Sequence, residues 1–366
     1  MPALISIATI GEVASAPVAA ASSIPLLGEA AGLGTAMCWV GTSFCFAAAS
    51  RRLGAGTVNL VRSVLALGPL LALNLLILGG AWPDASWEAI GWLALSGVVG
   101  LALGDQFLFV ALVDLGPRLA VLLMTLAPVF AAIAGLVMLS ERIAAPALLG
   151  MAITLGGIAW VVAERPAPGD ARAAITPPRV RARGLALGVL AAAAQGVGVV
   201  IAKQGMIGSD TPVEPLAAQL VRMSGGVTAL ALAWSILGPR RWLAGLDLRA
   251  GEARVTRPAV LGLIGGTLLG PVLGVWMSLV AVRALDAGVA STLMSLSPVL
   301  VLPIARIVDR ERIGWRAAVG AGVAVGGVVL LAASNRDAPA EAAIPDLPAI
   351  ELEVPSENPA REPNPT

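Results

Sequence analysis

A long internal repeat is the feature that most constrains the fold of this chain. The apolar stretch LLMTLAPVFAAIAGLVMLSERI (122–143) recurs as TLMSLSPVLVLPIARIVDRERI (292–313), at an offset of 170 residues counted from Pro128 to Pro298. Each copy has a methionine and a proline in its first half and a Glu-Arg pair at its end. A period well above 50 residues excludes a solenoid. The pattern therefore indicates a duplicated membrane unit.

Composition identifies the class of protein. Hydrophobic residues make up 57% of the chain and charged residues 13%, with a mean hydropathy of +0.87, whereas soluble proteins are roughly a quarter charged. We therefore expect an all-α integral membrane protein. The net charge of +1 provides no basic field for nucleic acid. We therefore expect no nucleic-acid partner. Histidine is absent, and Cys38 and Cys45 share one apolar span, so we also expect no metal and no cofactor.

Ten apolar segments are each long enough to cross about 30 Å of hydrocarbon at about 1.5 Å per residue. They form two sets of five, at 32–49, 55–78, 90–113, 117–139 and 145–163, and at 184–205, 215–237, 259–284, 288–308 and 315–333. The predicted organisation is an N-terminal extension, a first repeat, a basic linker, a second repeat and a disordered tail, at 1–28, 29–163, 164–183, 184–333 and 334–366.

The odd number of spans in each set predicts an inverted repeat, because the second set must enter the membrane from the opposite side. The loop at 79–89 contains no Lys or Arg, while its counterpart at 238–258 contains five arginines. Equivalent loops are therefore expected on opposite faces. Counted over the short loops, the positive-inside rule places both chain termini outside the cytoplasm.

The motifs together resemble the EamA-like branch of the drug/metabolite transporter superfamily. The residues that carry the resemblance are the paired MxLxPV motifs at 124–129 and 294–299, the pairs Glu141-Arg142 and Glu311-Arg312, and the double glycine Gly156-Gly157. The resemblance covers about 27–333. It implies a polytopic permease that exports or exchanges small metabolites, often amino acids, through a cavity between two halves. It also implies cytoplasmic termini, which disagrees with the orientation that the loop charges predict. This sequence departs from many relatives in having Asp105 within the third span and no tyrosine.

Asp105 and Gln106 are the first candidate residues of the substrate and ion pathway. Asp105 lies eight residues, or about 12 Å, from the end of the third span. A bare charge at this depth costs at least about 2.5 kcal/mol, so the carboxylate must face protein or water. It is either a carboxyl that exchanges a proton during transport or a structural carboxyl, neutral or paired with an arginine. Its repeat mate is Val275.

Five further polar side chains are candidates for the same pathway. Arg62 and Arg222 lie about seven residues inside their spans, where they either snorkel to the interface or hold an anionic group such as a substrate carboxylate. Trp39, Gln195 and Trp276 lie well inside their spans. They are expected to shape the pathway, with lipid-facing tryptophans as the alternative.

Two prolines inside spans are candidate kinks or gates. Pro128 and Pro298 each lack a backbone donor and crowd the carbonyl four residues back, which belongs to Met124 and Met294 respectively. A freed carbonyl inside a membrane needs a partner, which is either substrate or a coupling ion, or a neighbouring helix.

These features favour a secondary active transporter of small metabolites such as amino acids, working by alternating access in the bacterial inner membrane. Protons are the candidate coupling ion, with Asp105 as the titrating residue, and the protein is expected to be a monomer or homodimer in the lipid bilayer. No nucleophile-base pair or nucleotide-binding loop is present, so we expect no enzyme. The alternative is a non-transporting membrane receptor or scaffold.

Overall fold

The computed structural model describes residues 27–139, 145–163, 177–207, 213–237, 257–284, 293–294, 296–308 and 314–334. Nearly all of the predicted N-terminal extension, most of the linker, and all of the tail but Ser334 lie outside the described residues. So do both Glu-Arg pairs, Glu141-Arg142 and Glu311-Arg312.

The described elements are all helical, and several of them follow one another without a turn. In the first half they are α3 Leu27–Leu53, α4 Ala55–Leu73 continued by η1 Asn74–Leu78, α5 Trp87–Ser96 continued by η2 Gly97–Gly104 and α6 Asp105–Leu115, α7 Pro117–Leu123 continued by η3 Met124–Leu126 and α8 Ala127–Met138, and α9 Ala145–Ala163. In the second half they are α11 Pro178–Ile207, α12 Pro215–Leu237, α14 Arg257–Thr267 continued by η5 Leu268–Gly274 and α15 Val275–Ala284, α17 Ser297–Val308 and α18 Trp315–Ser334.

Helix length and composition confirm the all-α membrane class for the described residues. Seven helices are long and apolar enough to cross a membrane. Three shorter apolar helices, Leu148–Val162, Ser297–Val308 and Ala318–Leu330, lie where the fifth, ninth and tenth spans are predicted. The count of ten spans therefore stays a prediction.

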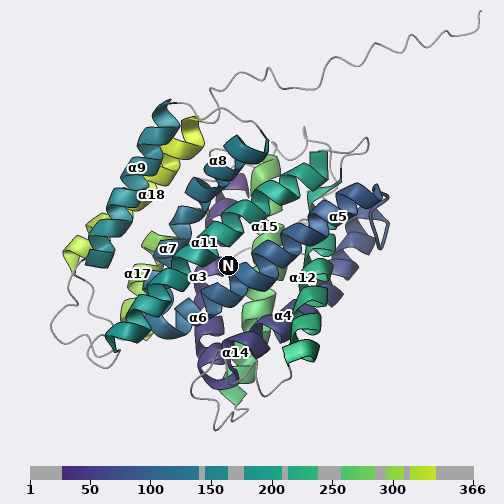
Figure 1. Cartoon of the computed structure of the whole chain (residues 1–366), viewed down its shortest axis with the longest axis horizontal. Helices are drawn as coiled ribbons and strands as arrows, with labels where there is room; N and C mark the ends of the chain where they lie inside the picture. The colour runs from purple at the N-terminus through teal and green to yellow at the C-terminus, as the bar shows by residue number, and fades with distance from the viewer. Residues whose placement is uncertain are drawn as a thin grey trace, which may run out of the picture.

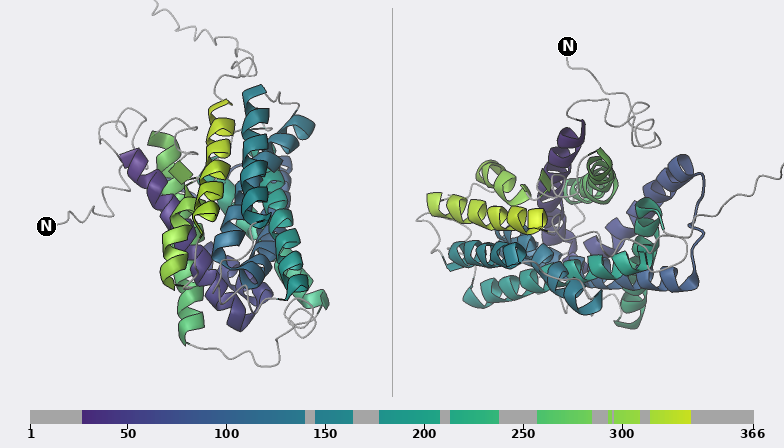
Figure 2. Two further views of the ribbon diagram at one scale, coloured as in Figure 1. Left: turned by 90° about the vertical axis from the view of Figure 1, so that its left-hand side faces the viewer. Right: turned by 90° about the horizontal axis from the view of Figure 1, so that it is seen from above.

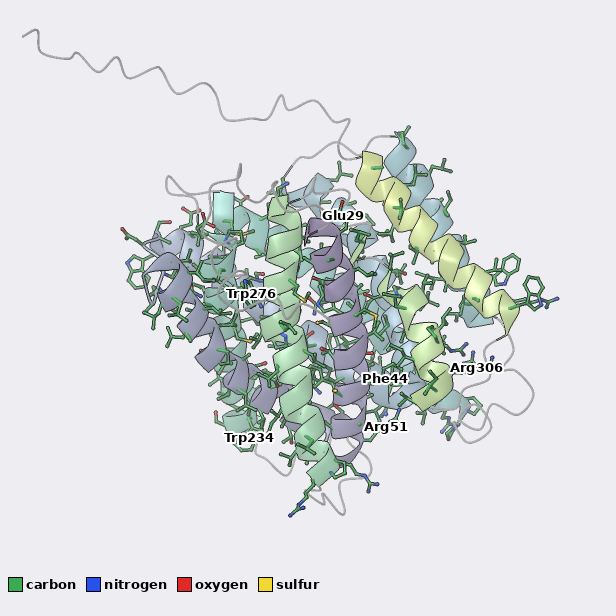
Figure 3. The ribbon with its side chains drawn as sticks, turned by 180° about the vertical axis from the view of Figure 1, so that it is seen from behind. Glu29, Phe44, Arg51, Trp234, Trp276 and Arg306 are labelled. Atoms are coloured by element: carbon green, nitrogen blue, oxygen red, sulfur yellow. The ribbon has the colours of Figure 1, made fainter. Side chains whose placement is uncertain are left out.

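The helices form a bundle in which each half packs its first span along the third span of the other (Figure 1). α11 packs along α5, η2 and α6, and α3 packs along α14, η5 and α15. In Figure 3, α3 runs from Glu29 at one end of the bundle to Arg51 at the other, beside the helix that carries Trp276. The third and eighth spans therefore lie at the contact between the two halves.

Two connections in the first half consist of a single glycine. Gly54, with φ 84°, joins α3 to α4, and Gly116, with φ 88°, joins α6 to α7. Residues with a Cβ atom rarely adopt a positive φ, whereas glycine does so at no steric cost. These turns keep consecutive spans close together without a polar loop.

α9 and α18 lie side by side at one edge of the bundle (Figure 2). A Cβ added at Gly157 would lie 2.5 Å from Ala324 N, and one added at Gly327 would lie 2.5 Å from Thr154 N. The hydroxyl of Thr154 donates to the carbonyl of Ala324 at 3.3 Å, and these two residues are also 170 apart. Residues related by the repeat therefore face one another across this contact.

The close contact between α9 and α18 gives a direct test of the packing. Gly157→Val should destabilise the protein by about 1–3 kcal/mol, because a new side chain would overlap the backbone of α18. Gly156→Val is the matched control, since nothing lies within 4 Å of its added Cβ. Thermal unfolding of the purified protein in detergent measures both. Equal midpoints for the two variants would contradict this packing.

Candidate functional site

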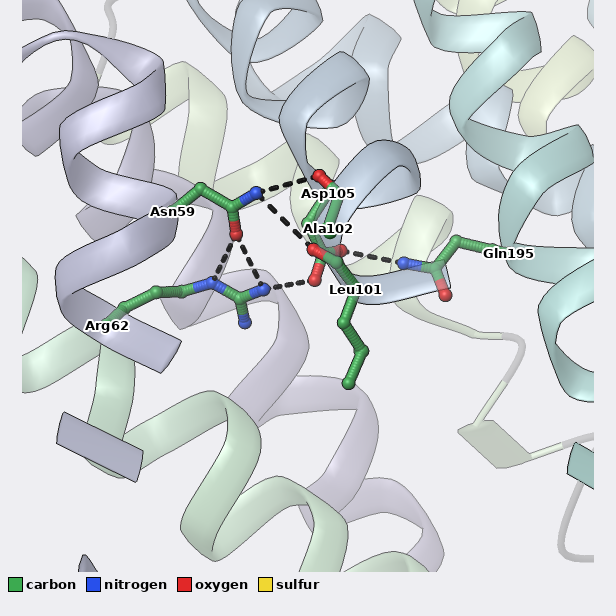
Figure 4. A network of polar contacts seen from close by, with 6 residues as sticks. All are labelled: Asn59, Arg62, Leu101, Ala102, Asp105 and Gln195. Carbon is green, nitrogen blue, oxygen red and sulfur yellow. Dashed lines mark hydrogen bonds and ion pairs between the residues drawn. The ribbon is translucent and has the colours of Figure 1, made fainter. Parts of the chain in front are cut away.

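Asp105 lies where the two halves of the chain meet. It begins α6 directly after η2, and only 7% of its surface is exposed. One carboxylate oxygen, Oδ2, accepts a hydrogen bond and ion pair from Arg62 Nη2 on α4 (Figure 4). The other, Oδ1, accepts from Gln195 Nε2 on α11 at 2.7 Å. The carboxylate therefore joins a first-half helix to a second-half helix.

Arg62 is held on several sides by protein groups. Its guanidinium carbon lies 5.0 Å from the ring centroid of Phe109 and 5.6 Å from that of Phe46, within the range of cation–π attraction. Nη2 and Nε donate to Asn59 Oδ1 at 3.1 and 3.3 Å. Arg62 is 5% exposed. Its charged end therefore lies inside the bundle, against Asp105. This pairing is the one described by the second alternative for Asp105, a structural carboxyl paired with an arginine.

The wide π-helical turn of η2 supplies backbone acceptors to the same network. Asn59 Nδ2 donates to the carbonyls of Ala102 at 3.0 Å and Leu101 at 3.3 Å (Figure 4). π-helical turns are rare and frequently occur at functional sites. The equivalent segment of the other half, η5, is also π-helical and contains Pro271, which lacks a backbone donor. The third span of each half therefore changes from α-helix to π-helix at the same place.

Arg222 approaches the network from α12. Its Nε donates to Ser96 Oγ at 2.9 Å and its Nη1 to Gln219 Oε1 at 3.1 Å. Ser96 Oγ in turn donates to the carbonyl of Gly198 on α11 at 2.6 Å. Arg222 also interacts electrostatically with Asp105. The two predicted arginines therefore lie in the same network, together with Asp105 and Gln195.

Glycines bring the backbones together around these side chains. A Cβ at Gly97 would overlap the carbonyl oxygen of Arg222, and one at Gly198 would lie 3.0 Å from Gly100 Cα. A Cβ at Gly225 would lie 2.6 Å from the carbonyl oxygen of Ala94. Small residues of this kind let membrane helices approach closely. The spacing of glycines along the third span thus places the polar groups of α11 and α12 against η2.

Gln106 and Trp276 occupy equivalent positions in the repeat, directly after Asp105 and directly after Val275. Gln106 is 6% exposed, and neither its Nε2 nor its Oε1 has a hydrogen-bond partner among the described residues. Within the same part of the chain the buried Nε1 of Trp276 also has none. Buried polar atoms normally have partners, so each of these needs an explanation.

The other predicted residues lie outside the network. Trp39 is 42% exposed and packs against Gly274, where an added Cβ would lie 3.3 Å from its ring. Pro128 follows the 3₁₀ turn η3, in which the amide of Ala127 donates to the carbonyl of Met124. In the second half the hydroxyl of Ser297, which precedes Pro298, donates to the carbonyl of Met294 at 3.0 Å. Both carbonyls thus have local partners.

Sequence reasoning missed three parts of this arrangement. Asn59 and Gln219 each lie three residues before an arginine, and this amide–arginine spacing in both halves was the available signal, because residues three apart share a helix face. The role of Ser96 had no sequence signal beyond its place in a glycine-rich span. A bidentate ion pair between Asp114 and Arg183, with distances of 2.8 and 2.9 Å, joins the end of α6 to the start of α11.

Comparisons with known proteins confirm the predicted resemblance. The model of the EamA-like transporter family matches residues 26–163 and 182–333. One similar solved structure, described only as "Crystal structure of protein", is 16% identical, with a TM-score of 0.56 over 84% of this chain and 98% of that chain. That likeness concerns the fold alone. None of the curated proteins compared with the sequence matches it.

The buried pair of Arg62 and Asp105 predicts a specific pattern of stability. Arg62→Gln should destabilise the protein by about 3–5 kcal/mol, because it leaves the Asp105 charge without its ion-pair partner. The double variant Arg62→Gln/Asp105→Asn should recover much of this loss, since no unpaired carboxylate remains. Unfolding in detergent measures both variants, and a double variant no more stable than Arg62→Gln would contradict the ion pair.

Proposed function

The chain belongs to the EamA-like transporter family, and from this we propose that it is a secondary active transporter that moves small metabolites such as amino acids across the bacterial inner membrane by alternating access. The observation that carries the proposal is the buried network in which Asp105 is bound by Arg62 from one half and Gln195 from the other. Buried ionisable groups inside membrane helices typically belong to substrate or ion pathways.

We propose that the protein contains ten spans arranged as two inverted halves. Two observations support this arrangement. Residues separated by the repeat offset face each other across α9 and α18, and both η2 and η5 interrupt their spans at equivalent positions. Inverted halves that share a central site are the usual architecture for alternating access.

The polar contacts around η2 differ in strength between and within the halves. Three hydrogen bonds of the network cross from the third span to the second half: Gln195 to Asp105, Ser96 to Gly198 and Arg222 to Ser96. Hydrogen bonds between membrane helices contribute on average about 0.6 kcal/mol each, with a maximum of about 1.7 kcal/mol. Breaking the buried ion pair within the first half costs about 3–5 kcal/mol. Around η2, breaking these hydrogen bonds therefore costs less than separating Arg62 from Asp105, while the ion pair of Asp114 with Arg183 joins the halves at the end of α6.

Asp105 is suited to couple this movement to protons. The charged groups facing it, among the described residues, are Arg62 from α4 and Arg222 from α12. Protonation would remove the negative charge that attracts both arginines, and would thereby change the contact between the halves at Gln195. Pro128, beside the 3₁₀ turn η3, and Pro298 remain the candidate hinges of the fourth and ninth spans.

The coupling role of Asp105 can be tested by flux measurements. Purified protein in proteoliposomes should transport members of a metabolite panel, and an imposed pH gradient should accelerate that flux. Asp105→Asn should lose the acceleration while remaining folded, because it cannot exchange a proton.

Asp114→Asn is the matched control, since Asp114 lies on the same helix but pairs with Arg183 at its end. This variant should keep the response to the gradient. Normal transport by Asp105→Asn with an unchanged pH profile would show that the proton role is wrong. Absence of flux for every solute would contradict the transporter itself.

A further inference from the structure

The charged residues outside the central network are divided unequally between the two ends of the bundle. Figure 3 shows Arg51 and Arg306 toward one end and Glu29 at the other. Successive spans run in opposite directions, so the bounds of the helices assign the remaining described charges to these ends. The end of Arg51 carries one described carboxylate, Asp114, and these arginines: Arg51, Arg52, Arg118, Arg179, Arg181, Arg183, Arg257, Arg306 and Arg316. The opposite end carries Glu29, Asp84, Glu88 and Glu214, with Lys203 and Arg283. The positive-inside rule predicts that the arginine-rich end faces the cytoplasm.

Four of these arginines surround the end of one apolar cluster that joins α9, α11, α17 and α18. These four helices contribute, among others, Val162, Leu185, Leu302 and Ala321 to it. Arg181, Arg306 and Arg316 each lie about one helical turn beyond the member on their own helix, toward the arginine-rich end. Arg179 lies two residues further along α11. We call Arg179, Arg181, Arg306 and Arg316 the arginine cluster.

Two members of the arginine cluster are held in place by neutral groups. Arg181 Nη2 donates to the carbonyl of Val162, near the end of α9, at 3.3 Å. The guanidinium carbon of Arg316 lies 5.6 Å from the ring centroid of Trp315, within the range of cation–π attraction. Asp114 is paired with Arg183, and no member of the arginine cluster forms an ion pair with a described carboxylate. The cluster therefore presents positive charge that the described part of the chain does not neutralise.

The two loops beside the cluster do not supply the missing negative charge in sequence. Each contains two acidic and two basic residues: Glu164, Arg165, Asp170 and Arg172 in 164–176, and Asp309, Arg310, Glu311 and Arg312 in 309–313. The acidic residues of 335–366 follow Ser334, at the opposite end of α18. The surplus of positive charge at the arginine cluster is therefore open to an anion from outside the chain.

Exposed tryptophans show that the arginine cluster lies at the level of the lipid headgroups. Trp315 is 70% exposed and Trp160 is 56% exposed. A Cβ added at Gly320, one turn from Arg316, would lie 3.5 Å from Trp160 Cδ1. Tryptophans of this kind are enriched where membrane and water meet. Apolar side chains further along α9 and α18 are also exposed: Leu155, Val319 and Val323. Charged groups and apolar faces thus adjoin on the same two helices.

We propose that the arginine cluster binds the phosphate groups of anionic phospholipids such as phosphatidylglycerol, with the acyl chains against the outer faces of α9 and α18. Arginine donates strong charge-assisted hydrogen bonds to phosphate. Basic sites between membrane helices on the cytoplasmic side bind anionic headgroups in this way. A soluble anion would compensate the arginines but leave the tryptophans and the apolar faces uncovered. This lipid site is independent of the solute that the protein moves.

The test measures lipid selectivity by native mass spectrometry. Purified full-length protein in detergent is mixed with equimolar phosphatidylglycerol and phosphatidylcholine that have the same acyl chains. The wild-type protein should retain phosphatidylglycerol about tenfold or more over phosphatidylcholine. Arg181→Gln/Arg316→Gln should lose most of this preference, because the attraction of each arginine to an anionic headgroup is removed. Its retention of phosphatidylcholine should not change.

A matched control separates this site from the general charge of the arginine-rich end. Arg52→Gln/Arg257→Gln removes two exposed arginines at the same end, on α3 and α14. It should keep the preference for phosphatidylglycerol within about twofold of the wild-type value.

Melting temperatures in phosphatidylcholine nanodiscs show whether each variant is folded, and they should equal that of the wild-type protein. Arg179→Gln/Arg306→Gln changes only exposed side chains, so it replaces the first variant if that one fails to fold. It should also lose most of the preference.

Three results would overturn the lipid site. One is equal retention of the two lipids by the wild-type protein. Another is an equal loss of preference in the cluster variants and in Arg52→Gln/Arg257→Gln, which would show attraction to the whole end rather than to this site. The third is displacement of phosphatidylglycerol by millimolar inorganic phosphate, which would assign the arginine cluster to a soluble anion.

Discussion

A carboxylate in the middle of a membrane-spanning helix must have partners, and this requirement organises the centre of the molecule. Asp105 meets it with an ion pair to Arg62 and a hydrogen bond from Gln195. Asn59 then fixes Arg62 and binds carbonyls of the π-helical turn that precedes Asp105. Replacing Asp105 by an apolar residue would leave Arg62 and Gln195 without their common acceptor, whereas Asn would keep an acceptor oxygen, so the fold and the proposed site depend on the same side chain.

The two halves are bound to each other differently from the way each is bound internally. Around η2 the contacts between the halves are single hydrogen bonds and glycine-mediated backbone packing, as at Gly97 and Gly198, while at the end of α6 they include the ion pair of Asp114 with Arg183. Within the first half the contact is a buried ion pair with aromatic rings on either side. A protein that alternates between two arrangements needs firm halves and a weaker contact between them.

Hydropathy and the repeat predicted the all-helical membrane class and the boundaries of most helices, and the family followed from the resemblance of the paired motifs. Asp105, Gln195, Arg62 and Arg222 were also identified from sequence, because polar residues inside apolar spans stand out. Their partners were not predicted, since pairing depends on how each helix is rotated about its axis, which the number of apolar residues does not fix. The π-helical turn η2 was missed for a related reason: it contains no proline, and Asn59 compensates it from another helix.

The central claim is that the halves move against each other around Asp105, and distances between them measured during turnover test it most directly. In a Cys38→Ser/Cys45→Ser background, spin labels would replace the exposed residues Arg52 and Arg179 at one end of the bundle, and Leu76 and Val199 toward the other. Pulsed electron paramagnetic resonance in proteoliposomes with solute and a pH gradient should show two distances for each pair, one pair lengthening as the other shortens. A single, unchanged distance for both pairs would contradict alternating access.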